Sequence, residues 1–276
     1  MPGPQPSRPK PSLVLTIAGF DPSSGAGTTA DLKTIAAHGL YGLACITALT
    51  VQSTQGVRRV EPLRGELVRE TLEALFEDSP PDAVKIGMLG SAEVAAAVAA
   101  FLRDHCPAHL VIDPVLRSSS GADLIDAKGL AILKQDLLAL ADVITPNIEE
   151  AVALSEIPVA DAGSAQLAGI RLLELGARNV VVTGGHFASP DDLLVESGDT
   201  GPVFTRFPGK RIDTPNTHGT GCAFSTSLAC HLALGISVRQ AVAKAKEFVA
   251  LALGNSFATG KGPGPVNPSP LEQFHG

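Results

Sequence analysis

Short apolar runs alternate with segments of helical periodicity along nearly the whole chain, and this alternation limits the folds available to it. Runs rich in Val, Leu and Ile predict buried strands at 13–18, 83–86, 110–112 and 179–183. Between them, apolar residues recur at helical spacing, as in 67–76. Strands that alternate with helices predict right-handed crossovers and a mostly parallel sheet with helices on both faces. We therefore expect an α/β protein with three layers, helix, sheet and helix.

The remaining expected elements complete this alternation. We expect helices at 28–38, 63–78, 91–102, 130–140, 148–154, 166–175, 221–234 and 238–257, strands at 41–50 and 142–145, and a hairpin region at 193–211. No linker rich in Pro, Gly or Ser divides the chain, so a single domain over 13–276 is predicted. Residues 1–12 are Pro-rich and basic, and we expect a disordered tail there.

Composition excludes several classes of partner. The 276 residues carry a formal net charge of −7 without a long run of Lys or Arg, which argues against nucleic acid. No apolar stretch approaches the ~20 residues that span a bilayer, so no membrane partner is expected. The four cysteines show no CxxC pairing, and a reduced, cytoplasmic compartment is the better interpretation.

Unusual residues gather where the predicted strands end. They are Gly19 to Asp21, Gln52, Met88, Asp113 to Val115, Asn147 and Gly184 to His186. In an open α/β sheet, ligands bind beyond the carboxyl ends of the strands. This coincidence predicts an enzyme.

The segment Asn216 to Cys222, NTHGTGC, has the features of an anion site. Gly219 and Gly221 allow a tight turn and a close approach to a ligand. The first N–H groups of the following helix lack partners, and the helix dipole is positive there. Several such donors can stabilise charge on a phosphoryl group during transfer. The alternative is a Gly-rich loop before an ordinary helix start.

Cys222 sharpens this hypothesis. A lone cysteine is usually a small buried hydrophobe, which is the favoured interpretation of Cys45 and Cys230. At a helix N-terminus, however, the pKa of a thiol can fall towards neutrality. We expect a Cys222 thiolate beside the anion site to take the proton of an attacking alcohol, which typically contributes ~10²–10⁴-fold.

Motifs in the same order resemble a known family. They are Thr16-Ile-Ala-Gly19, Ser24-Gly-Ala-Gly27, Ala30-Asp-Leu-Lys-Thr34, Tyr41-Gly42, Ile46-Thr-Ala-Leu49, Lys85-Ile-Gly-Met-Leu89, Asp113-Pro-Val115, Ile144-Thr-Pro-Asn147, Gly184-Gly-His186 and Asn216 to Cys222. Together they resemble the hydroxymethylpyrimidine/phosphomethylpyrimidine kinases of thiamine biosynthesis, in the ribokinase-like superfamily. The likeness covers nearly all of 13–265. It implies a ribokinase-like fold and phosphorylation of 4-amino-5-hydroxymethyl-2-methylpyrimidine by ATP, with its monophosphate as a second acceptor.

The resemblance also implies roles for individual residues. It implies that Cys222 is the catalytic base and that Gly219, Thr220 and Gly221 form the anion hole. For the substrate, it implies polar contacts from Asp31, Gln52 and the backbone of Gly19, with Met88 and Val115 as apolar walls. A Gln amide offers both a donor and an acceptor, which matches an aminopyrimidine edge. Taken singly, Met88 is better explained as a core residue, and the alternative for Asp31 is a first-turn helix charge. The joint order and spacing of the motifs favour the substrate contacts.

For the nucleotide, Asn147 and Glu150 resemble an NxxE motif that organises magnesium and triphosphate, and Thr183 stands at a position where Lys is frequent. Glu150 would hold Mg²⁺, directly or through water, because magnesium on phosphates needs only one or two carboxylates. The alternative for Glu150 is a solvated helix residue. ATP and Mg²⁺ are thus the expected cofactors, K⁺ is left open, and a homodimer is expected from the resemblance.

Some positions depart from the family pattern. Phe20 stands where Ser or Thr is usual, and Arg117-Ser-Ser119 replaces a stretch that usually ends in Lys. Arg and Lys differ in reach and geometry, so phosphate handling is altered there. Thr183 also occurs in relatives that phosphorylate pyridoxal, which keeps a pyridoxal-type kinase as one alternative. Gln52 favours the pyrimidine.

Two further alternatives come from other classes of protein. A non-catalytic pyrimidine-binding descendant is consistent with Phe20 and the missing lysines. A dinucleotide oxidoreductase is suggested by Gly25-x-Gly27-x-x-Ala30. That signal is weak, because the glycines lie several residues past the strand and no acidic residue follows about 20 positions later.

Overall fold

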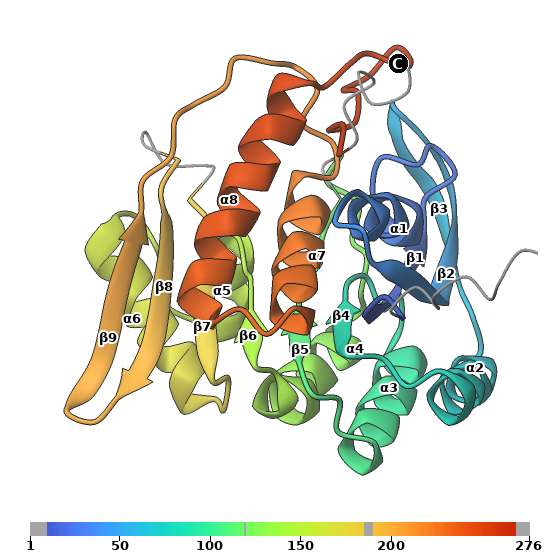
Figure 1. The fold of residues 1–276 in the computed structure, drawn as a ribbon, viewed down its shortest axis with the longest axis horizontal. Coiled ribbons are helices and arrows are strands. Elements are labelled where there is room, and N and C mark those ends of the chain that lie inside the picture. Colours follow the sequence, from blue (N-terminus) through green and yellow to red (C-terminus); the bar gives the residue numbers. More distant parts are fainter. Residues whose placement is uncertain (1–9, 119, 185–189, 269–276) are drawn as a thin grey trace, which may run out of the picture.

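The computed structural model describes residues 10–118, 120–184 and 190–268. Most of the predicted tail at 1–12 lies outside this range, as do Ser119, Gly185 and His186. The described part of the chain is built around one nine-stranded sheet with the strand order β3-β2-β1-β4-β5-β6-β7-β8-β9 (Figure 1). The strands are β1 (Leu13–Phe20), β2 (Tyr41–Ser53), β3 (Gly56–Pro62), β4 (Ala83–Ile86), β5 (Leu110–Ile112), β6 (Val143–Ile144), β7 (Asn179–Val182), β8 (Asp192–Gly198) and β9 (Gly201–Phe207).

The six neighbouring strands β2, β1, β4, β5, β6 and β7 run parallel, as predicted. Antiparallel strands extend both edges, with β3 beside β2 and the β8–β9 hairpin beside β7. The predicted hairpin region at 193–211 is thereby confirmed. Because the carboxyl ends of the central parallel strands share one edge of the sheet, the loops after β1, β4, β5 and β6 meet there.

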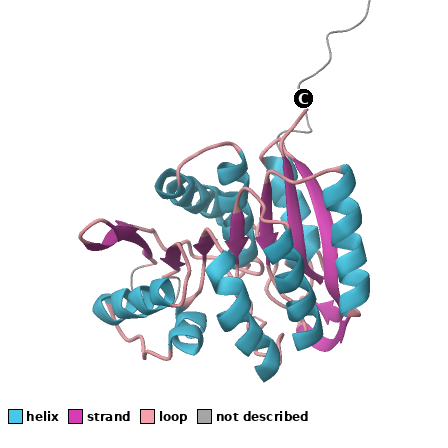
Figure 2. Ribbon diagram, turned by 90° about the horizontal axis from the view of Figure 1, so that it is seen from below, coloured by secondary structure: helices cyan, strands magenta, loops and turns pink. Residues whose placement is uncertain are grey.

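Helices cover both faces of the sheet, as the view from below shows (Figure 2). They are α1 (Gly27–Ala37), α2 (Gly65–Asp78), α3 (Ala92–Asp104), α4 (Ala127–Ile132), α5 (Ile148–Ser155), α6 (Ala162–Glu174), α7 (Thr220–Ala233) and α8 (Val238–Gly254). Buried residues of α7 and α8 pack with one face of the strands, and those of α2, α3, α5 and α6 pack with the other. The expected three-layer fold is confirmed.

Strand β1 shows how the sequence separates the two cores. Leu15 and Ile17 pack into the core shared with α2 and α3, while Val14 packs into the core shared with α7 and α8. All three side chains are fully buried, and burial of such a side chain stabilises the fold by about 1.5–3 kcal/mol. A strand buried on both faces reads as a continuous apolar run, which is why the run 13–18 predicted it.

Two elements differ from expectation. Strand β3 was not predicted, because its Arg58 and Arg59 interrupt any apolar alternation, and both are exposed on an edge strand. The helix expected at 130–140 begins earlier, at Ala127, where the Asp126 carboxylate accepts a hydrogen bond from the N–H of Gly129. It then changes to a π-helical turn at Leu133–Leu137 and a 3₁₀ turn at Leu138–Leu140. Among the described residues, no helix is long and apolar enough to span a bilayer.

Candidate active site

A cavity of about 1730 Å³ opens at the carboxyl ends of the parallel strands. It brings together nearly all of the residues predicted for the site, although they come from elements far apart in the chain. Those that line it are Gly19, Gln52, Met88, Val115, Asn147, Glu150, Thr183, Gly219, Thr220, Gly221 and Cys222. Ligand pockets usually measure ~300–1,000 Å³, so this cavity has room for two small molecules at once.

The predicted anion loop forms the N-terminus of α7. Gly219 adopts a left-handed conformation, with φ of 82°, and an added Cβ would overlap the carbonyl oxygen of Gly25. Only glycine fits this close approach. Within the described part of the chain, the N–H groups of Gly221 and Cys222 find no acceptor. They are the unpaired donors that a helix N-terminus offers to an anion.

Cys222 is partly exposed and lines the cavity beside these donors. Burial raises the pKa of its thiol to about 12, and the charge of Lys85 and the N–H of Gly27 only partly oppose that effect. The expectation that the helix N-terminus brings this pKa towards neutrality is therefore wrong. Desolvation of the thiolate is the largest cause of this upward shift, and Asp31 and Asp113 add to it. At neutral pH the thiol of the unliganded protein is protonated.

Asp31 differs from the prediction. Its side chain is fully buried and does not line the cavity. One carboxylate oxygen accepts from Lys85 Nζ at 2.9 Å and Thr16 Oγ1 at 2.6 Å, and the other accepts from Thr226 Oγ1 at 2.7 Å. These donors come from β4, β1 and α7, so Asp31 joins elements beneath the cavity and lies outside its lining.

Lys85 connects this buried network to the cavity, because its side chain is fully buried and also lines the cavity floor. Burial alone would lower the pKa of Lys85, but the negative charge of Asp31 raises it, so the ammonium stays charged. Sequence reasoning included Lys85 only within a motif. Its signal was a Lys inside an otherwise apolar strand, where a charge requires a partner.

Asn147 and Glu150 form a capping box at the start of α5. Asn147 Oδ1 accepts from the N–H of Glu150 at 3.0 Å, and Glu150 Oε2 accepts from the N–H of Asn147 at 2.9 Å. Glu150 is therefore not the solvated helix residue of the alternative interpretation, since only 7% of it is exposed. Burial, followed by the charge of Asp113, raises the pKa of Glu150 to about 8.

Asp113 is the second carboxylate of this pair. It is buried near Gly221, and one of its oxygens accepts from Ser225 Oγ at 2.9 Å. Burial also raises the pKa of Asp113, although Lys85 opposes the shift. The charge of Asp113 disfavours ionisation of Glu150, and two carboxylates placed in this way suit a divalent cation. Among the described residues, no cluster of three or more His, Cys, Asp or Glu forms a complete metal site.

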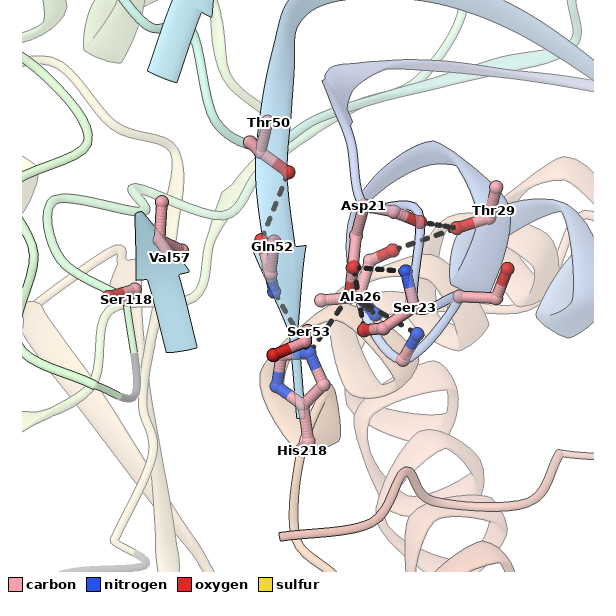
Figure 3. Close-up of polar contacts among 12 residues, drawn as sticks. Asp21, Ser23, Ala26, Thr29, Thr50, Gln52, Ser53, Val57, Ser118 and His218 are labelled. Atoms are coloured by element: carbon pink, nitrogen blue, oxygen red, sulfur yellow. Dashed lines mark hydrogen bonds and ion pairs between the residues drawn. The ribbon is translucent and has the colours of Figure 1, made fainter. Parts of the chain in front are cut away.

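A polar cluster at the other side of the anion loop was missed by the sequence reasoning (Figure 3). Asp21 Oδ1 accepts from the N–H and hydroxyl of Ser23, and Oδ2 accepts from the N–H groups of Gly25 and Ala26. His218 Nε2 lies 2.9 Å from the same Oδ2. Burial alone would raise the pKa of Asp21, but the hydrogen bonds from His218 and Ser23 lower it.

The predicted apolar wall is present. Met88 packs in a small cluster with Ala48 and Leu124, and Val115 packs against that cluster. Gly19 borders it closely, because an added Cβ would lie 2.9 Å from Met88 Sδ. Phe20, the residue that departs from the family pattern, also lines the cavity. Arg117, in contrast, is exposed and pairs with Asp123 at 2.8 Å.

At the far end of the cavity, Thr183 lies beside the start of α5, where its N–H donates to the carbonyl of Pro146. Lys246 of α8 pairs there with Asp192 at 2.6 Å. Thr183, Lys246 and the anion loop at Gly219–Cys222 all line this one cavity.

A family model described as phosphomethylpyrimidine kinase matches residues 21–267. The chain belongs to this family. Among curated relatives, it is 43% identical to the hydroxymethylpyrimidine/phosphomethylpyrimidine kinase of Haemophilus influenzae over 257 residues, covering 92% of this chain and 95% of the relative. It is 44% identical to the thiamine biosynthesis bifunctional protein ThiED of Geobacter sulfurreducens over 256 residues. The match covers 92% of this chain but only about half, 51%, of that longer relative.

Solved structures of kinases share the fold of this chain. The phosphomethylpyrimidine kinase of Clostridium difficile is 38% identical with a TM-score of 0.77, covering 87% of this chain and 98% of that one. The Bacillus subtilis pyridoxal kinase in complex with ADP is 32% identical with a TM-score of 0.86, covering 95% and 99%. The expected ribokinase-like kinase fold is thereby confirmed.

Proposed function

We propose that this protein transfers the γ-phosphoryl group of ATP to the hydroxymethyl group of 4-amino-5-hydroxymethyl-2-methylpyrimidine. The observation that carries the proposal is that one cavity is lined by the Gln52 amide, the anion loop at Gly219–Cys222 and the buried carboxylates of Asp113 and Glu150. Membership of the phosphomethylpyrimidine kinase family supports the same reaction. The named relatives support a place in thiamine biosynthesis.

The pyrimidine would lie between Gln52 and the apolar wall of Met88 and Val115. Its hydroxymethyl oxygen would attack the γ-phosphorus while the bond to the β-phosphate oxygen breaks and ADP leaves. The unpaired N–H groups of Gly221 and Cys222, together with that of Gly219, would stabilise charge on the transferred group. The N–H of Thr220 already donates to the carbonyl of Thr217 at 3.3 Å and would have to turn towards the phosphate to take part. The hydroxyl proton would pass to the thiolate of Cys222 and then to solvent.

ATP would extend from the anion loop towards Thr183, with Asn147 fixing the start of α5. Asp113 and Glu150 fit a magnesium ion on the triphosphate, because a divalent cation would favour the charged carboxylates, whose pKa values are raised by burial and, for Glu150, also by the charge of Asp113. Bound there, Mg²⁺ would neutralise phosphate charge. Phosphorylation of the monophosphate, assistance by K⁺, a homodimer, a single domain over 13–276 and a cytoplasmic location remain parts of this proposal.

The test is ADP release in a coupled assay with the hydroxymethylpyrimidine and Mg·ATP. We expect turnover that depends on both substrates. Release of ADP indistinguishable from the pyrimidine-free control would refute the proposal, provided that ADP binding shows the protein to be folded.

A pyridoxal-type kinase is the second candidate, favoured by the structural match to pyridoxal kinase. Gln52 on the cavity wall supports the pyrimidine instead. Turnover of the two acceptors should be compared in one preparation, and we expect a higher kcat/KM for the pyrimidine.

A further inference from the structure

The side-chain amide of Gln52 is held from both sides. On one side its nitrogen lies 3.3 Å from His218 Nε2, and on the other its oxygen lies 3.2 Å from Thr50 Oγ1 (Figure 3). Both neighbours also bond elsewhere, because His218 Nε2 contacts Asp21 Oδ2 and Thr50 Oγ1 donates to the carbonyl of Phe20 at 3.0 Å. The positions of the protons on His218 and Thr50 determine which neighbour the Gln52 oxygen faces and which the nitrogen faces.

At His218 the proton count is decided by Asp21. A carboxylate accepts only, and Asp21 already receives four hydrogen bonds from its own loop. The contact of 2.9 Å with Oδ2 therefore requires the proton to be on Nε2. A protonated Nε2 cannot accept a bond from the Gln52 amide nitrogen, so the amide group facing it must be the oxygen.

At Thr50 the same count gives the same answer. Its hydroxyl has one proton, which is used by the carbonyl of Phe20. The hydroxyl oxygen can still accept, so the amide group facing it must be the nitrogen. After half a turn of the Gln52 amide about its last bond, its nitrogen donates to Thr50 Oγ1 and its oxygen faces the His218 N–H, whose single proton it shares with the nearer Asp21 Oδ2. The two sides agree although they are independent.

We infer that His218 and Thr50 are positioning residues that fix the amide of Gln52 in one orientation and thereby set which acceptor the cavity takes. The inference rests on the proposed function. Once held, the amide has one N–H and one oxygen lone pair left, with the N–H on the Thr50 side and the oxygen on the His218 side. A ligand must offer an acceptor and a donor in the matching order, as the ring nitrogen and amino group of a 4-aminopyrimidine do.

Close packing keeps His218 in place. An added Cβ at Gly25 would overlap the His218 ring, and the N–H of His218 donates to the carbonyl of Gly264 at 3.1 Å. The side chain of His218 is only 14% exposed. The ring therefore cannot turn without moving the Asp21 loop.

The discriminating probe is the 4-oxo analogue of the hydroxymethylpyrimidine, which presents a carbonyl oxygen and a ring N–H and so reverses the donor and acceptor. Dissociation constants of the amino compound and the analogue should be measured by calorimetry. We expect the parent protein to prefer the amino compound by about 100-fold, since each mispaired group costs roughly tenfold in affinity. In a Thr50→Val/His218→Leu variant the amide can turn, and the preference should fall to about tenfold or less.

Matched controls separate this effect from damage to the fold. Thr50→Ser keeps the hydroxyl, and His218→Gln keeps an N–H donor near the position of Nε2, so both should retain the preference. A preference unchanged in the double variant, or equal binding of both compounds to the parent, overturns the inference while the kinase proposal stands. A parent that binds ADP but not the amino compound removes the proposed function and the inference with it.

A second measurement tests the protonation of His218 directly and requires no ligand. In protein labelled with ¹⁵N-histidine, the Nε2 of His218 should show the chemical shift of a proton-bearing nitrogen, assigned by its loss in His218→Gln. An unprotonated Nε2 at neutral pH would contradict the proton count and overturn the inference.

Discussion

Cys222 lies where two opposing effects act on one sulfur. The cavity wall desolvates it, and the buried ammonium of Lys85 partly compensates. A base with a raised pKa is strong when ionised but rarely ionised at pH 7. Its contribution to a reaction is therefore set by the small fraction of thiolate.

Replacement of Cys222 by Ala should lower turnover by about 100-fold or more, since general-base catalysis typically contributes ~10²–10⁴-fold. ADP affinity, measured by calorimetry, should change little. The exposed Cys106 provides the matched control, and Cys106→Ala should keep parental turnover. Equal rates for Cys222→Ala and the parent would place the base elsewhere.

The rate should also depend on pH in a defined direction. Because burial raises the pKa of Cys222 to about 12 in the unliganded protein, the thiolate fraction increases with pH across the whole neutral range. The rate at which iodoacetamide alkylates Cys222 should therefore increase about tenfold per pH unit between roughly pH 7 and 9. A plateau beginning near pH 7 would show that the thiol ionises at neutrality.

Lys85 and Asp31 form the fully buried ion pair beneath the site. Loss of one partner leaves a buried charge uncompensated, which costs about 3–5 kcal/mol. Lys85→Met should lower the Tm measured by calorimetry by several degrees, and Asp31→Leu added to it should restore part of the loss. The control is Arg69→Met, which removes an exposed pair with Glu73 and should leave Tm nearly unchanged. Equal losses would refute the argument.

At the scale of elements, the start of α5 is a helix cap that also faces the cavity. The pKa of Glu150 is about 8 when folded, above its ordinary value near 4.5. A raised carboxyl pKa favours the folded state below the unfolded pKa, and this stabilisation is lost as pH rises through the folded pKa.

In the metal-free protein, this carboxyl should therefore destabilise the fold progressively between about pH 4.5 and 8. Glu150→Gln should have a flatter profile of Tm against pH than the parent over that window, and Mg²⁺ should raise the Tm of the parent more than that of the variant. Parallel profiles would contradict the assignment.

Most elements could be predicted from the sequence because buried parallel strands and amphipathic helices leave periodic patterns. Strand β3 could not, because an exposed edge strand has few apolar residues to alternate. Within the site, Gly219, Gly221 and Cys222 could be predicted because they are neighbours in the chain at the start of one helix. The burial of Asp31 beneath the cavity could not be predicted, because its partners Thr16, Lys85 and Thr226 are far from it in the chain. The same holds for Asp21 and His218, which are 197 positions apart.

At the scale of the whole molecule, the cavity has a volume of about 1730 Å³, which exceeds that of most single-ligand pockets. We expect ADP and the hydroxymethylpyrimidine to bind together. Each ligand at about 100 times its Kd should stabilise the fold by ~2.7 kcal/mol. Thermal shifts with both should approach the sum of the separate shifts. A combined shift no larger than the greater single one would indicate mutual exclusion.

The direct contact of Gly219 with Gly25 bears on how the protein is made. A ribosome would have completed three quarters of the polypeptide before the second of these loops exists. A nascent or prematurely terminated chain would therefore lack half of its phosphate pocket. Until that loop has emerged, neither nucleotide nor vitamin precursor could assist folding, so ligand rescue of unstable variants would act only late in synthesis or after it.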